Sequence, residues 1–127
     1  MPPIKVMHVA EITIGGIASH LAEILPLQVE LLGKGNVALL LPDNEHAQVP
    51  EIDGLVVEVF SPAASRLRSA WTLSRRLKEL RRTYRPDIVH AHSSFGGLAA
   101  RLFGGAGATP VIYCPHGWPF TQDIPEW

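Results

Sequence analysis

Short, almost continuously apolar runs alternate along this chain with longer segments whose apolar residues recur at helical spacing, and this alternation limits the fold more than any other feature. Such runs are typical of strands that are buried on both faces of a sheet. Strands are predicted over Ile4–Val9, Val37–Leu41, Leu55–Phe60, Asp87–His92 and Val111–Cys114. Helices are predicted from Ile17 to the glycines at 33 and 35, over Ser65–Tyr84 and over Ser94–Ala106.

The order of these elements predicts an α/β, Rossmann-like fold of three layers with a parallel sheet of about five strands. Right-handed crossovers favour the strand order 3-2-1-4-5, with the first helix on one face and the other two helices on the opposite face. A length of 127 residues fits one domain, which we assign to residues 1–127.

Three features of this fold carry further expectations. Pro26 should kink or divide the first helix. The polar link Pro42–Gly54 should be unable to cover the sheet, which would leave apolar surface on Val37–Leu41 and Val111–Cys114. Trp118, Phe120 and Trp127 in the tail also need a partner surface, so we expect the chain to form a two-fold homodimer.

Composition narrows the class of protein. The net charge of −1 gives no indication of nucleic-acid binding. Cys114 is the lone cysteine, which excludes an internal disulfide and fits a reducing compartment. No segment approaches the roughly 20 apolar residues of a membrane span. We expect a cytoplasmic protein whose membrane contact, where present, is peripheral.

Candidate site residues gather where the predicted strands end, because parallel sheets of this kind bind ligands at the carboxyl ends of their strands. Gly15 and Gly16 precede the first helix, whose free N–H groups favour an anion such as a phosphate. His92 and Ser93 end the fourth strand, and His116 follows the fifth. A loop histidine there can donate a hydrogen bond to a sugar hydroxyl or a phosphate.

The residues at this edge fit other chemistries less well. His90 shares a strand face with His92 and is interpreted as a buried, hydrogen-bonded histidine. His8, His92 and His116 together could hold zinc, but His8 lies within a strand and no neighbouring carboxylate is obvious as its partner, so no metal is expected. Nucleophilic catalysis is not favoured, because Ser93 and Ser94 lack a G-x-S-x-G elbow and Cys114 lies in an apolar run.

The segment 65–85 carries most of the positive charge, eight of the eleven lysines and arginines. Trp71, Arg75, Lys78 and Arg82 fall on one stripe of the predicted helix, opposite its apolar stripe. One interpretation is a solvated face. The other is a membrane-facing surface in which tryptophan and cations meet anionic lipid.

As a set, three segments resemble the retaining "group 1" type of GT-B glycosyltransferase. Lys5–Val9 followed by Gly15–Gly16 resembles the opening of that family, and Arg85–His92 resembles its "PDIVHAH" strand. Pro110–Gly117 resembles its following segment, which ends in HG. Their order and spacing match over nearly the whole chain.

The resemblance implies a two-domain enzyme in which this domain binds the acceptor and a C-terminal domain binds the nucleotide-sugar donor. It implies that Gly15 and Gly16 face the donor diphosphate and that His116 orients the donor sugar. His92 and Ser93, at the end of the fourth predicted strand, are assigned to the acceptor side or the cleft. The sugar would pass to a carbohydrate or lipid-linked acceptor with retention, without a metal or other cofactor.

This sequence also departs from the family pattern. The family's E-x7-E glutamate pair belongs to the C-terminal half, and no two glutamates here have that spacing. The donor-binding domain is therefore expected to be absent and the isolated chain inactive. The alternative hypotheses are a non-catalytic carbohydrate- or nucleotide-binding module that works with a separate partner chain, and an unrelated Rossmann-like regulator or phosphate-binding protein.

Overall fold

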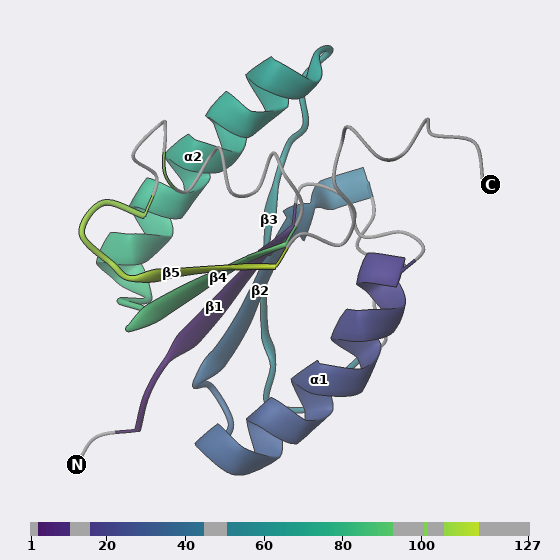
Figure 1. Ribbon diagram of the computed structural model, residues 1–127, viewed down its shortest axis with the longest axis vertical. Coiled ribbons are helices and arrows are strands. Elements are labelled where there is room, and N and C mark those ends of the chain that lie inside the picture. Colours follow the sequence, from purple (N-terminus) through teal and green to yellow (C-terminus); the bar gives the residue numbers. More distant parts are fainter. Residues whose placement is uncertain (1–2, 11–15, 45–50, 93–100, 102–105, 115–127) are drawn as a thin grey trace, which may run out of the picture.

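A five-stranded parallel sheet forms the centre of the computed structural model, which describes residues 3–10, 16–44, 51–92, 101 and 106–114. The strand order is β3-β2-β1-β4-β5 (Figure 1). The strands are β1 (Val6–Ala10), β2 (Val37–Pro42), β3 (Val56–Phe60), β4 (Ile88–His92) and β5 (Val111–Cys114). The described helices are α1 (Gly16–Leu32) and α2 (Arg66–Thr83). The predicted fold class and strand order are confirmed.

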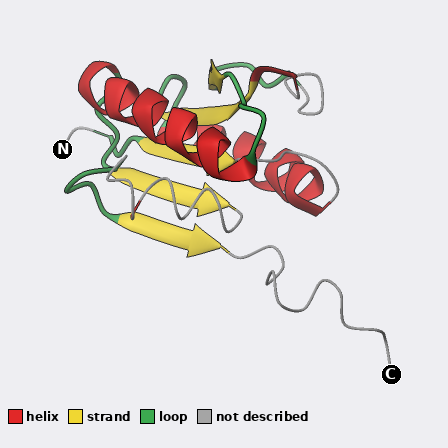
Figure 2. Ribbon diagram, turned by 90° about the horizontal axis from the view of Figure 1, so that it is seen from above, coloured by secondary structure: helices red, strands yellow, loops and turns green. Residues whose placement is uncertain are grey.

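The two helices cover opposite faces of the sheet (Figures 1 and 2), as the crossover rule predicted. One core lies between α1 and the sheet, and the other lies between α2 and the sheet. The first contains Leu21, Leu25, Val29, Val37, Leu39 and Leu41. The second includes Met7, Val9, Leu40, Leu73, Leu77 and Val89. Most of the predicted helix Ser94–Ala106 lies outside the described residues.

The prediction that Pro26 divides the first helix is wrong, because α1 runs without a break from Gly16 to Leu32. Pro26 is exposed, so its ring does not disturb the packed side of the helix. Leu25 and Val29, on either side of it, are buried in the same core against the sheet. That shared packing holds the two halves of α1 together.

The expectation of exposed surface on Val37–Leu41 is also wrong, since all residues of β2 are buried. The link between β2 and β3 contributes to this burial, because Ile52 and Leu55 pack against the core beneath α1. A link that is polar on average can therefore still cover a sheet with two apolar side chains. On β5, by contrast, Ile112 remains 52% exposed, in line with the prediction for that strand.

Several polar contacts fix the helix ends and the edge strand. Ser65 caps α2 by accepting a hydrogen bond from the N–H of Arg68. The hydroxyl of Tyr84, at the other end of α2, donates to the carbonyl of Gly35 at 2.9 Å. Arg76 binds β3 through the carbonyl of Val59 at 3.0 Å and the carboxylate of Glu58 at 2.7 Å.

Candidate functional site

The carboxyl ends of three adjacent strands form the candidate ligand edge. Ala10 at the end of β1 pairs with His92 at the end of β4, and His92 pairs with Cys114 at the end of β5. The chain therefore leaves the sheet at three neighbouring points, after Ala10, after His92 and after Cys114. Gly16 and His116 follow the first and the third of these points in the sequence. This is the arrangement on which the predicted site depends.

The predicted site residues themselves fall largely outside the description. Gly15, Ser93 and His116 are not among the described residues, so their place at this edge remains a prediction. Gly16 is the first residue of α1, and no acidic side chain occupies the first turn of that helix. The N–H groups at the start of a helix suit a negatively charged ligand. His92 is described, and its side chain is fully buried.

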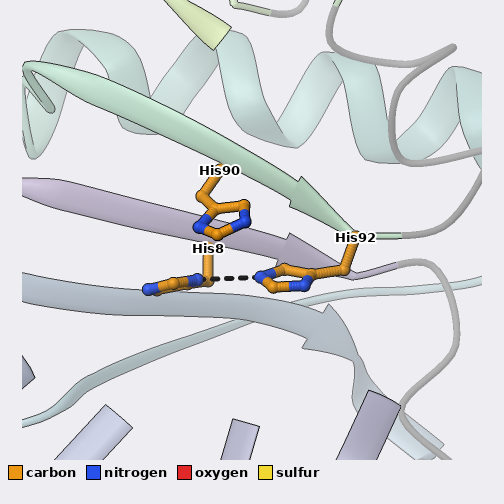
Figure 3. Close-up of side chains that lie close together, drawn as sticks. All are labelled: His8, His90 and His92. Atoms are coloured by element: carbon orange, nitrogen blue, oxygen red, sulfur yellow. Dashed lines mark hydrogen bonds between the residues drawn. The ribbon is translucent and has the colours of Figure 1, made fainter. Parts of the chain in front are cut away.

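Three histidines meet on the sheet face that α1 covers (Figure 3). In the parallel register of β1 and β4, His8 lies opposite His90 and Ala10 opposite His92. Met7, Val9 and Val89 point into the α2 core, so their strand neighbours His8, His90 and His92 point to the other side. The alternation of two adjacent strands thus places the three imidazoles together.

The rings in this group, which we call the histidine triad, are in close contact. Nδ1 of His8 lies 2.8 Å from Nε2 of His92. The ring centroids of His90 lie 4.3 Å from those of His92 and 4.9 Å from those of His8. Nitrogen atoms of all three residues lie within 4.8 Å of one another. In Figure 3, the ring of His90 lies over the gap between the other two.

Helix α1 supplies two further polar groups to the triad. The side-chain oxygen of Gln28 lies 2.6 Å from Nε2 of His8. Because an amide oxygen can only accept, Nε2 of His8 carries the hydrogen and Nδ1 is left as the acceptor of the bond from His92. The ring of His20 lies 5.8 Å from that of His92, centroid to centroid.

The buried environment keeps the triad neutral at His8. Burial lowers the pKa of the His8 imidazole from 6.5 to about 4, the hydrogen bond with Gln28 opposes that change, and the neighbouring His90 and His20 reinforce it. Low polarity disfavours the charged imidazolium, so His8 is neutral near pH 7.

The sequence predicts only part of this group. His8 and His92 were candidates for a metal site with His116, and His90 was interpreted as structural, whereas the structure places His90 in the group, half-buried. His20 and Gln28 were not among the candidates. His20 and Gln28 are eight residues apart, about one helical turn before and one after Ile24. This spacing is the signal that could have placed both on the sheet-facing side of the helix.

The basic stripe of α2 forms a separate surface. Among the described residues, a groove of about 510 Å³ is lined by Trp71, Arg75, Lys78, Glu79, Arg82 and Thr83. All four predicted stripe residues line it, and Trp71 is 48% exposed. The four stripe residues thus form one continuous surface, opposite the buried face of α2. Within the described segments, no helix is long and apolar enough to cross a membrane.

A model of the glycosyl transferase 4-like domain family matches residues 4–127. The chain belongs to this family. Its domain is therefore glycosyltransferase-like, which agrees with the broader part of the resemblance found in the sequence. EpsD of Bacillus subtilis (strain 168), a protein named as a glycosyltransferase, is 41% identical over 54 residues, which cover 40% of this chain and 14% of EpsD.

Solved structures support the fold. The glycotransferase of kitacinnamycin aligns with a TM-score of 0.70 at 17% identity, over 93% of this chain and 32% of that chain. A UDP-N-acetylglucosamine 2-epimerase aligns with a TM-score of 0.55 at 19% identity, over 89% of this chain and 32% of that chain. At such identities the likeness concerns the fold alone. The glycosyltransferase-like chain spans about a third of each of these structures.

Proposed function

We propose that this domain is the acceptor-side half of a glycosyltransferase that moves a sugar from a nucleotide-sugar donor to a carbohydrate or lipid-linked acceptor, with retention of the anomeric configuration. The observation that carries the proposal is the family match over residues 4–127. The sheet topology supports it, because β1, β4 and β5 end side by side where ligands of such sheets bind.

In this proposal the domain positions the reacting groups and stabilises charge. Gly15 and Gly16 let the donor diphosphate approach the start of α1, where the N–H groups of the helix favour the negative charge that develops as the phosphate leaves. His116 donates a hydrogen bond to the donor sugar and orients it. His92 ends β4 and Ser93 follows it in the sequence toward the proposed cleft, and the buried ring of His92 gives this edge a rigid base.

Donor binding is proposed to require residues beyond this domain. The chain spans 14% of EpsD and 32% of the kitacinnamycin glycotransferase. We expect a second Rossmann-like domain, carrying the E-x7-E pair, to hold most of the nucleotide sugar. No metal or other cofactor takes part in the proposed transfer. The purified 127-residue chain should therefore show no turnover and only weak binding of nucleotide sugars.

The test is a transfer assay on the longest natural protein that contains this chain, with a panel of nucleotide sugars and with carbohydrate and lipid-linked acceptors. The expected result is transfer from at least one donor, with the product's anomeric configuration, read by NMR, equal to that of the donor. An inverted product would remove retention alone. Nucleotide-sugar binding without transfer to any acceptor would instead favour the non-catalytic module.

A further inference from the structure

We propose that the histidine triad, His8, His90 and His92, is a binding site for a Zn²⁺ ion on the α1 face of the sheet. Neither the family match nor the proposed transfer chemistry requires such an ion. The inference depends on three nitrogen ligands that adjacent strands bring within 4.8 Å of one another. Imidazole nitrogen is among the preferred ligands of zinc in proteins.

The spacing of the rings fits three ligands around one ion. Zinc–nitrogen bonds of about 2.0–2.1 Å in tetrahedral geometry place the nitrogens roughly 3.3 Å apart and the ring centroids about 5 Å apart. The three centroid distances in the triad are 4.9, 5.1 and 4.3 Å. In the metal-free protein the three rings are stacked or tilted, with interplanar angles of 34°, 27° and 20°, and Nδ1 of His8 lies 2.8 Å from Nε2 of His92. Zinc binding therefore requires the side chains to rotate until their nitrogens point toward one position.

The protonation states also fit. A zinc ligand must be a neutral imidazole whose coordinating nitrogen carries no hydrogen, and Nδ1 of His8 meets this condition because Nε2 holds the hydrogen bonded to Gln28. His92 currently donates from Nε2 to that lone pair. Zinc binding at Nε2 of His92 requires the other neutral tautomer of this ring, with the hydrogen on Nδ1, and Nε2 then becomes the second ligand. No net proton is lost, and His90 supplies the third nitrogen.

Gln28 acts as a positioning residue for the site. Histidines that bind zinc usually donate their other N–H to an acceptor that fixes the orientation of the ring. No carboxylate for that role is evident in the sequence, but the amide oxygen of Gln28 occupies the position, 2.6 Å from Nε2 of His8. Three protein ligands leave a fourth position for water or another group, as in open zinc sites.

The experiment is a calorimetric titration of tag-free, metal-stripped protein with Zn²⁺, repeated with Co²⁺, whose visible absorption reports a tetrahedral nitrogen site. We expect one ion per chain with submicromolar affinity. His90→Gln should weaken binding more than about 100-fold, since losing a ligand should exceed the roughly 10–100-fold effect of an outer-shell partner. His46→Gln, which removes a histidine in the link between β2 and β3, should leave affinity unchanged.

Gln28 is tested with a matched pair of substitutions. Gln28→Leu should weaken zinc binding by about 10–100-fold. Gln28→Glu keeps a hydrogen-bond acceptor at this position and should bind zinc about as tightly as wild type. Circular dichroism verifies that each variant is folded, and His92→Gln replaces His90→Gln if the latter does not fold. Wild-type protein that takes up no stoichiometric Zn²⁺, or a folded triad variant that binds as tightly as wild type, would overturn the proposal.

Discussion

Nδ1 of His8 and Nε2 of His92 lie 2.8 Å apart, although 84 residues separate them in the sequence. Both side chains are fully buried. One hydrogen lies between the two nitrogens, and a second hydrogen on the accepting nitrogen would break the hydrogen bond. The contact therefore links the stability of the sheet to the protonation state of its central histidines.

Acidification should destabilise the metal-free protein over a defined range of pH. The pKa of His8 is about 4 in the folded state and 6.5 ordinarily, so the unfolded chain binds more protons between these values. Stability is fully present above about pH 6.5 and falls as the pH drops toward 4. From pH 7.5 to 5 the expected loss is about 2 kcal/mol, measured by urea unfolding in the presence of EDTA.

The control for this prediction is His8→Gln, which cannot take up the proton. Its unfolding free energy should depend less on pH by about the same amount. His90 and His92 contact His8 and His20 acts on its charge, and all three are retained in the variant, so the difference between the two proteins reports on His8. Equal pH dependence in the two proteins would contradict the assignment.

Arg76 should stabilise the fold far more than its neighbour Arg75. Arg76 donates to the carbonyl of Val59 and to the carboxylates of Glu58 and Glu79, and thereby joins α2 to the edge strand β3. Arg76→Ala should lower the free energy of unfolding by about 1–2 kcal/mol. Arg75→Ala, on the exposed stripe, should change it by less than about 0.5 kcal/mol. Similar losses in thermal unfolding would refute this role.

The α2 stripe should bind anionic membrane surfaces. Trp71 is 48% exposed beside Arg75, Lys78 and Arg82 in one groove, and each basic residue near an anionic bilayer contributes about 1 kcal/mol. The double variant Arg75→Glu/Lys78→Glu should weaken binding to phosphatidylserine vesicles at least about 10-fold. Binding is measured by vesicle co-sedimentation.

The matched control for the stripe is Lys34→Glu/Arg66→Glu, which makes the same change in net charge away from the groove. It should retain most of the vesicle binding. If both double variants lose binding equally, the attraction depends on overall charge and the stripe is a solvated face.

Self-association also stays a prediction, and the candidate dimer surface is now limited to the edge strand β5. β2 is covered, but Ile112 on β5 is 52% exposed on the sheet face that α1 occupies elsewhere. Ile112→Lys should shift the 127-residue chain toward monomer in sedimentation velocity experiments. Leu31→Lys, on an 82% exposed side chain at the end of α1, should not. A wild-type monomer at all concentrations would count against the dimer.

The sequence predicted the strand order correctly because apolar runs and helical stripes repeat in a pattern that few topologies can satisfy. It failed where tertiary packing outweighs a local preference. Pro26 lies within an unbroken helix because neighbouring leucine and valine side chains are anchored on the sheet. Ile52 covers β2 from a link whose average composition is polar.

The candidate site was harder to predict than the fold. Alternation along a strand indicated that His90 and His92 share a face, but the inclusion of His8 depends on the register between β1 and β4. Register between distant strands is set by the whole sheet, and no local motif reveals it. Gln28 joins the group because of the rotation of α1, which the packing of Leu21 and Leu25 determines.

The most direct test of the glycosyl-transfer account is the transfer rate of the longest natural protein that contains this chain, compared between wild type, His116→Ala and the control His46→Ala. His116→Ala removes a hydrogen-bond donor that orients the sugar and stabilises developing charge, so it should lower the transfer rate on the order of 100-fold. The rate of the control should be unchanged. Absence of any sugar transfer by the wild-type protein, or an unchanged rate in His116→Ala, would contradict the account.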